Sequence, residues 1–325
     1  MSIALASPSP QTAHDSTSGL GSMGLPMAVN LQTHLQSTSG WPLNFTNRTL
    51  SRGDPLLQLG AASCPSVPDV VAQSDIIFLS LSDDAALGAT IGAILNAESS
   101  LDGKVFVDTS TVHPDSSAKS ELFLKKRGAS FVASPVFGAS PVAQTAQLLF
   151  VIAGPSAAVE SIMPYVTGVM GRGVIRLGED VRQSSLLKTA GNFMTAGMME
   201  LIAETHVFAE KAALPSDAVA TLLKENFGPL AHTMSERLTL GAYCPPPGQR
   251  PWSDLNLAVK DVGHGVKCAE DVGAKLHIGE VVLEHLKEAQ KEGRPLDSSS
   301  LYGVLRREAG LDFETDFVKK RDGVQ

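Results

Sequence analysis

Short apolar runs alternate with helical or loop segments between about residues 75 and 178. Five runs have the composition of β-strands, several of them apolar on both faces, and a sixth follows a helix that begins near Met23. The expected strands cover residues 43–47, 75–82, 104–108, 130–133, 148–153 and 173–177. Because strands that alternate with helices build a parallel sheet with helices on both faces, this pattern predicts a doubly wound α/β domain.

The pattern changes after Gly178. From about Gln183 to Ala212 apolar residues recur at helical spacing and no proline interrupts them, which predicts one long helix. Further helices are expected at 216–225, 254–272, 276–292 and 298–309, with breaks at Gly228-Pro229 and Pro245–Gly248. The predicted organisation is an irregular or disordered lead-in (1–18), an α/β domain (19–180) and an all-helical domain (181–325), joined by the long helix.

Three glycines, Gly19, Gly21 and Gly24, follow the spacing G-x-G-x-x-G directly before the first predicted helix. In dinucleotide-binding folds the first glycine permits a tight turn, the second lets a pyrophosphate approach the backbone, and the third lets the helix pack closely on its strand. The candidate cofactor site also includes the intervening Leu20, Ser22 and Met23. A flexible Gly/Ser loop has a similar composition, so the glycines alone leave both interpretations open.

The strand that should precede these glycines is poorly defined. Gln11–Ser18 is polar and lacks the apolar run of a buried strand, whereas the apolar Ile3–Ala6 lies far upstream. Either Ile3–Ala6 supplies the strand across an insertion, or Gln11–Ser18 is forced into its place, or a mistaken exon junction altered this part of the chain.

Composition excludes several classes of protein. A net charge of −8 and a pI near 5.5 argue against a general nucleic-acid binder, because no basic stripe is available to neutralise phosphates. Three widely spaced cysteines, Cys64, Cys244 and Cys268, predict neither a disulfide framework nor a metal site and fit a reducing compartment. The sequence has no apolar run of about 18 residues and does not begin with a basic region followed by an apolar one, so we expect neither a membrane span nor a secretory signal. We therefore expect a cytoplasmic protein, with mitochondria as the alternative location, and no membrane partner.

Polar residues follow two of the expected strands. Asp108–Thr111 lies at the carboxyl end of one strand, where parallel sheets bind ligands, although such a segment can also be a turn that caps the next helix. Ser134–Ala139 lies at the end of the next strand, where its glycine and alanine leave backbone N–H groups accessible to a ligand. The alternative is that this segment is only a structural strand exit. The candidate ligand-binding residues here are Ser110, Thr111, Phe137, Gly138 and Ala139.

Lys188 and Asn192 are four residues apart on the long helix and therefore share one of its faces. The neighbouring Leu187 and Met194 place this face beside the apolar side of the helix. A lysine in such a position can act as a general acid or base toward a carbonyl or hydroxyl group. The alternative is the ordinary solvated face of a long helix.

The segment after the second strand bears on the choice of cofactor. An NAD site needs an acidic residue about 20 positions after the glycines to bind the ribose 2′-hydroxyl, whereas an NADP site needs arginine. No Asp or Glu occurs between Gly24 and Asp54, and Asn47-Arg48-Thr49 stands there with Arg52 nearby. This favours NADP over NAD, and the alternative is an arginine on a solvated turn.

Taken in order, these motifs resemble the β-hydroxyacid dehydrogenase family, which includes 3-hydroxyisobutyrate dehydrogenase and glyoxylate or succinic semialdehyde reductases. The matching elements span about residues 19–275 and are Gly19–Leu31, Asp108–Thr111, Pro135-Val136 with Gly138, Lys188 with Asn192, and Lys260-Asp261. The resemblance implies a Rossmann-type domain like that of 6-phosphogluconate dehydrogenase, followed by a helical domain that pairs into homodimers or homotetramers.

The resemblance also implies roles for individual residues. Lys188 is expected to donate or accept the proton at the hydroxyl carbon, with Asn192 orienting the substrate. Ser110, also counted as catalytic, and the backbone around Gly138 would hold the substrate carboxylate or carbonyl, and Lys260 would reach the nicotinamide and substrate. The same comparison adds Leu81, Ser82 and Ser110 to the cofactor site and Thr111, Phe137 and Ala139 to the substrate site.

The expected function is an NADP-dependent oxidoreductase that transfers a hydride between the nicotinamide and the carbinol or carbonyl carbon of a small β-hydroxy acid or semialdehyde. Two alternatives are an imine reductase, a class that generally lacks the lysine, and a non-catalytic NADP-binding module. The family usually has Ser and Gly where this chain has Phe137 and Ala139, which indicates a less polar or differently shaped substrate.

Overall fold

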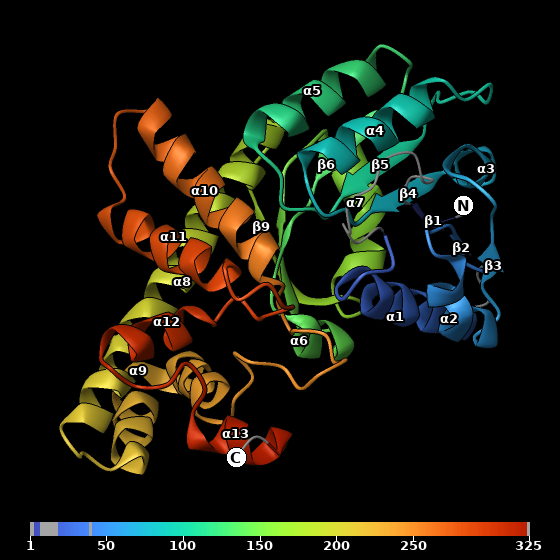
Figure 1. Cartoon of the computed structure of the whole chain (residues 1–325). Coiled ribbons are helices and arrows are strands. Elements are labelled where there is room, and N and C mark those ends of the chain that lie inside the picture. The colour runs from blue at the N-terminus through green and yellow to red at the C-terminus, as the bar shows by residue number, and fades with distance from the viewer. Residues whose placement is uncertain (1–2, 7–18, 39–40, 324–325) are drawn as a thin grey trace. The chain divides into compact units, whose positions relative to one another are not determined.

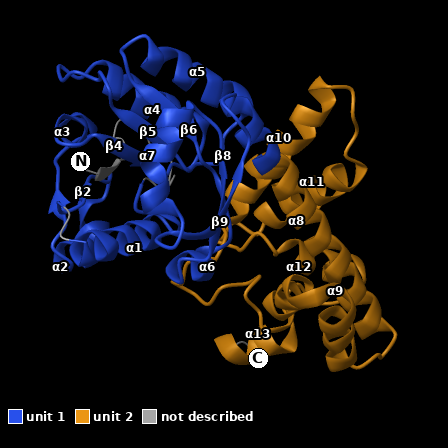
Figure 2. Ribbon diagram, turned by 180° about the vertical axis from the view of Figure 1, so that it is seen from behind, with its two compact units in different colours: residues 1–188 blue, residues 189–325 orange. Residues whose placement is uncertain are grey.

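The computed structural model describes residues 3–6, 19–38 and 41–323 (Figure 1). The chain divides into two compact units, unit 1 at residues 1–188 and unit 2 at residues 189–325 (Figure 2). The division falls inside the long helix, whereas the change of sequence pattern placed it at about residue 180.

Unit 1 is built on a six-stranded sheet in the order β3-β2-β1-β4-β5-β6, with every pairing parallel. The strands are β1 (Ile3–Ala6), β2 (Asn44–Phe45), β3 (Ala62–Ser63), β4 (Ile76–Leu79), β5 (Val105–Asp108) and β6 (Ser130–Ala133). The strand order reverses between β1 and β4, the point at which doubly wound sheets bind their ligands. The predicted doubly wound α/β fold is confirmed.

The central strand is formed by Ile3–Ala6, one of the candidates from the sequence. Leu5 pairs with Phe45 of β2 and with Phe78 of β4, so β1 connects the two halves of the sheet. The other candidate, Gln11–Ser18, lies outside the described residues.

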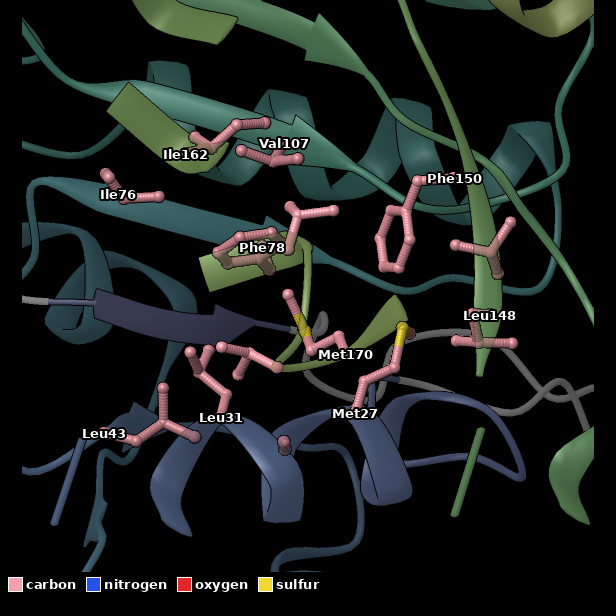
Figure 3. Close-up of a cluster of buried hydrophobic side chains, with 14 of the residues drawn as sticks. Met27, Leu31, Leu43, Ile76, Phe78, Val107, Leu148, Phe150, Ile162 and Met170 are labelled. Atoms are coloured by element: carbon pink, nitrogen blue, oxygen red, sulfur yellow. The ribbon is translucent and has the colours of Figure 1, made fainter. Parts of the chain in front are cut away.

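Successive residues of β4 pack into different apolar clusters on opposite faces of the sheet. Ile76 and Phe78 belong to a cluster with Met27 and Leu31, shown in Figure 3, whereas Ile77 and Leu79 belong to another. Burial on both faces explains why this strand is a continuous apolar run. The helices of unit 1 are α1 (Gly24–Ser37), α2 (Asp54–Gln58), α3 (Val67–Ala72), α4 (Asp84–Leu95), α5 (Pro114–Lys125), α6 (Ser140–Gln144) and α7 (Ser156–Val166), with a 3-10 turn at Leu50–Gly53.

A second sheet in unit 1 has the order β7-β8-β9. Its strands are β7 (Val136–Phe137), β8 (Leu148–Ile152) and β9 (Gly171–Arg176), with β7 antiparallel and β9 parallel to β8. The sequence predicted β8 and β9 as strands but not their separate sheet, because an apolar run does not specify its pairing partner. The two-residue strand β7 lies within the segment 134–139, which the sequence predicts to follow a strand rather than to form one.

All the named secondary-structure elements in the described part of unit 2 are helices. The long helix α8 (Val181–Lys211) begins in unit 1 and is followed by α9 (Ser216–Thr239), α10 (Leu255–Asp271), α11 (His277–Gln290), α12 (Leu301–Glu308) and α13 (Asp316–Asp322). The predicted break at Gly228-Pro229 is a kink inside α9, where Gly228 has a φ of 84°, and the helix continues beyond it. The sequence did not predict α13. In the described part of the chain no helix is long and apolar enough to span a bilayer.

Candidate functional site

The glycine turn is packed directly against the start of α1. A Cβ built on Gly24 would lie 1.6 Å from the carbonyl oxygen of Gly19 and 3.1 Å from Ser80 Oγ, so only a hydrogen fits there. Within α1, all of whose residues are described, no side chain caps the N-terminus and the first turn carries no acid. The positive end of the helix is therefore suited to an anion, as a dinucleotide pyrophosphate requires.

Asn47 ties this turn to the segment after β2. Its Oδ1 accepts a hydrogen bond of 2.9 Å from the Leu20 N–H, and its Nδ2 donates one of 2.8 Å to the Thr49 carbonyl. The side chain is buried, whereas Arg48 is half-buried and Thr49 is exposed. Asn47, predicted from the sequence as a cofactor residue, thus uses its amide to hold the turn in place.

Ser110 lies where two neighbouring strands end. Its hydroxyl accepts a 2.8 Å hydrogen bond from the N–H of Leu81, which follows β4, so the structure brings these two predicted residues together. The Ser110 N–H in turn donates to Asp108 Oδ1 at 3.0 Å. The hydroxyl of Ser82, also a predicted cofactor residue, donates to Asp83. The buried Asp108, for which the sequence predicts no separate role, accepts the bond from the Ser110 N–H and so fixes the turn that carries Ser110.

Lys188 contacts a residue of the second sheet. Its side chain is buried, with 8% of the residue exposed, and its Nζ lies 4.3 Å from the centre of the Phe137 ring in β7. An ammonium group over an aromatic face is attracted by the ring, so this contact favours the charged amine. The predicted substrate residues of unit 1 differ in exposure: Gly138 is exposed, whereas Thr111, Phe137 and Ala139 are half-buried.

In unit 2, the Asp261 carboxylate contacts both Asn192 and Lys260, the two predicted residues of that unit. Asn192 Nδ2 donates to Asp261 Oδ2 at 2.9 Å, and Lys260 Nζ forms an ion pair of 2.8 Å with Asp261 Oδ1. Gly265 lets α10 approach α8 closely, because a Cβ there would lie 3.2 Å from the Thr189 carbonyl oxygen. The sequence pointed to the Lys260-Asp261 pair but assigned Asp261 no role, and the structure shows that it orients both partners.

The predicted residues thus form two groups. The glycine turn, Ser110, Phe137 and Lys188 belong to unit 1, whereas Asn192 and Lys260 belong to unit 2. Lys188 and Asn192 are one turn apart on α8, as their spacing predicted. No group of three potential metal ligands is found among the described side chains.

Comparison with known proteins agrees with these features. The family model for the NAD-binding domain of 6-phosphogluconate dehydrogenase matches residues 16–178, and the model for NAD-binding of NADP-dependent 3-hydroxyisobutyrate dehydrogenase matches residues 183–305. The NADH-dependent oxidoreductase ucdB of Aspergillus ustus is 33% identical over 296 residues, which cover 90% of this chain and 99% of that protein. Glyoxylate/succinic semialdehyde reductase 1 of Arabidopsis thaliana is 32% identical over 208 residues, covering 63% of this chain and 69% of that protein.

A solved structure shares the fold. The 3-hydroxyisobutyrate dehydrogenase of Mycobacterium tuberculosis, solved with L-serine, aligns with a TM-score of 0.74 at 22% identity, covering 94% of this chain and 99% of that one. The two family models together cover most of both units. The chain belongs to the β-hydroxyacid dehydrogenase family of NAD(P)-dependent oxidoreductases.

Proposed function

We propose that this chain is an NADP-dependent enzyme that interconverts a small β-hydroxy acid and the corresponding semialdehyde, with Lys188 as the general acid and base. The observation that carries the proposal is the buried Lys188 amine, held over the Phe137 ring one helical turn from Asn192. The relative from Arabidopsis thaliana is named for semialdehyde reduction, which supports the substrate class.

The residues of the chain divide the chemistry as follows. When bound, the nicotinamide supplies or accepts the hydride at the substrate's carbonyl or carbinol carbon. The Lys188 ammonium donates a proton to the carbonyl oxygen as that oxygen gains charge, and in the reverse direction the amine takes the proton back. Asn192, held by Asp261, orients the substrate, while the glycine turn and α1 hold the pyrophosphate.

A two-cofactor substrate panel tests this function. Purified protein should oxidise small β-hydroxy acids and reduce their semialdehydes, with a higher kcat/KM for NADP(H) than for NAD(H), measured as nicotinamide absorbance. Cyclic imines belong in the same panel. Turnover of the imines alone would support an imine reductase, and NADPH binding without turnover of any substrate would support a non-catalytic module.

Arg48 is proposed to select NADP over NAD. It follows β2, no acidic residue occupies the positions between Gly24 and Asp54, and a guanidinium binds phosphate through charge-assisted hydrogen bonds. We expect Arg48→Ala to weaken NADPH binding by about 10- to 100-fold and leave NADH binding nearly unchanged, as measured by fluorescence titration. The control is Arg250→Ala, at an exposed position of unit 2. Equal losses of affinity for NADPH and NADH, or no loss, would reject this assignment. NAD is the alternative cofactor, since ucdB is named as NADH-dependent.

We also propose a homodimer, with a homotetramer as the larger alternative. Met194, Leu201 and Phe208 are spaced by seven residues on α8, share one face of the helix, and are each about two-thirds exposed at 65%, 64% and 66%. Such an apolar stripe is suited to burial against a second copy. Sedimentation should show a dimer or larger assembly for the wild type and a shift toward monomer for Leu201→Glu. Leu57→Glu, at an exposed position of α2, is the control, and a monomeric wild type would contradict the proposal.

A further inference from the structure

The contact between Phe137 and Lys188 is held by one strand of the small sheet. The backbone of Phe137 pairs with Leu149 of β8. Helix α8 is fixed to the same strand, because Ser184, one turn before Lys188, donates a 2.6 Å hydrogen bond to the Val151 carbonyl. The backbone segments that carry the aromatic ring and the amine are therefore both anchored to β8 within unit 1.

The residue after Phe137 fixes the end of β7. Gly138 has a φ of 131°, a conformation that favours glycine, and a Cβ there would lie 2.7 Å from Leu148 Cδ2 and 2.8 Å from Val142 Cγ1. Glycine is therefore required at this turn, because Leu148 and Val142 leave no room for a Cβ. Phe137 is the large side chain that the turn presents next to Lys188.

A phenyl ring has two effects on an amine at this distance. Its negative face attracts the ammonium and so favours the protonated, proton-donating state. It also offers no hydrogen-bonding atom to a molecule that approaches the amine. A substrate oxygen that accepts a hydrogen bond of about 3 Å from Nζ stays within about 7 Å of the ring centre, since Nζ itself is 4.3 Å from it. A small substrate bound to Lys188 therefore lies within reach of this hydrocarbon surface.

We propose that Phe137 is a positioning residue for the Lys188 ammonium and the specificity-determining wall beside it. The site then takes β-hydroxy acids in which the carbon that bears the carboxylate carries a hydrocarbon substituent rather than a hydroxyl. This inference rests on the proposed function, because it requires that Lys188 acts on the substrate. The positioning role and the specificity role can be tested separately. Phe137→Tyr keeps the aromatic face, whereas Phe137→Leu keeps only an apolar side chain.

The positioning part is tested without turnover. The protein, saturated with NADPH, is treated with an amine-reactive reagent over a pH series, and modification of Lys188 is quantified by mass spectrometry. We expect Phe137→Tyr to keep the pH of half-maximal modification, and Phe137→Leu to lower it by about half a unit or more, because leucine has no aromatic face for the ammonium. The midpoint is compared rather than the rate, since a smaller side chain also changes access. An unchanged midpoint in Phe137→Leu would overturn the positioning role.

The specificity part uses two acids that differ in a single group. 3-Hydroxyisobutyrate carries a methyl group where glycerate carries a hydroxyl. The ratio of their kcat/KM values therefore measures how strongly the site prefers the hydrocarbon substituent. Wild type and Phe137→Leu should favour the methyl compound, and Phe137→Ser should lower the ratio by about tenfold or more. Phe317→Ser, at an exposed position of α13, is the control. A ratio that is the same in Phe137→Ser and wild type would overturn the specificity role.

These outcomes remain distinct from failure of the proposed function. If the wild type turns over no hydroxy acid or semialdehyde of the panel, or if Lys188→Ala keeps full activity, the function is wrong while the labelling midpoint still decides whether Phe137 holds the amine. If the wild type turns over glycerate but not 3-hydroxyisobutyrate, the function stands and the specificity role of Phe137 is wrong. If Lys188→Ala is inactive and the acid ratio does not respond to Phe137→Ser, the function stands and the wall is wrong.

Discussion

Replacing Lys188 by alanine is expected to lower kcat by about 100- to 10,000-fold, the usual contribution of a positioned general acid or base. The amine is buried over the Phe137 ring, and the structure places Asn192 one turn further along α8. NADPH affinity should change little, because the glycine turn and Arg48 are proposed to carry cofactor binding. Steady-state assays with the best substrate of the panel, together with NADPH titration, measure both quantities.

The control for this substitution is Lys224→Ala, at an exposed position of α9. It removes the same side chain without touching the proposed site, so kcat should stay within about twofold of the wild type. Thermal unfolding of Lys188→Ala shows whether the variant is folded. Full turnover of every hydroxy acid and semialdehyde by folded Lys188→Ala would show that Lys188 is not the proton donor.

Replacing Gly24 by alanine is expected to abolish measurable NADPH binding or weaken it by at least about 100-fold. The added methyl group would lie 1.6 Å from the Gly19 carbonyl oxygen, which is backbone and cannot rotate aside. The glycine turn must therefore move away from α1, and the pyrophosphate loses both the turn and the helix N-terminus. Fluorescence titration with NADPH measures the loss, and thermal unfolding measures its cost to stability.

Gly88→Ala is the matched control, because Gly88 is exposed within α4 and its added Cβ would meet no atom within 4 Å. Alanine should raise the free energy of unfolding here by about 0.5–1 kcal/mol and leave NADPH binding unchanged. Wild-type NADPH affinity in Gly24→Ala would mean that the dinucleotide does not bind at this turn.

Motifs with a local physical requirement could be recognised before the fold was known. The glycine spacing predicted the tight approach that the structure shows at Gly24, and four-residue spacing predicted that Lys188 and Asn192 share a helix face. Periodicity predicted the long helix α8 and most strands, because apolar faces must be buried whatever their partner is. The break at Gly228-Pro229 was also recognisable, since proline and positive φ both disturb a helix.

Other features depend on residues that are far apart in the sequence. Asn47 lies 27 residues after Leu20, and Asp261 lies 69 residues after Asn192, so no local pattern shows that either pair is hydrogen-bonded. The separate β7-β8-β9 sheet was missed for the same reason, since strand pairing is a long-range property. The short helix α13 has only seven residues, too few for a clear periodic signal.

The family, the doubly wound α/β fold with its helical second part, and the candidate cofactor and catalytic residues could all be predicted from the amino-acid sequence. Each of these follows from residue types at short, fixed spacings, which reflect turn geometry, helix period and strand burial. Four features became visible only in the folded chain: Ile3–Ala6 forms the central strand, Asn47 holds the glycine turn, Asp261 orients Asn192 and Lys260, and Phe137 lies against Lys188. These contacts arise when strands and helices pack, so their partners are chosen by the fold rather than by neighbouring residues.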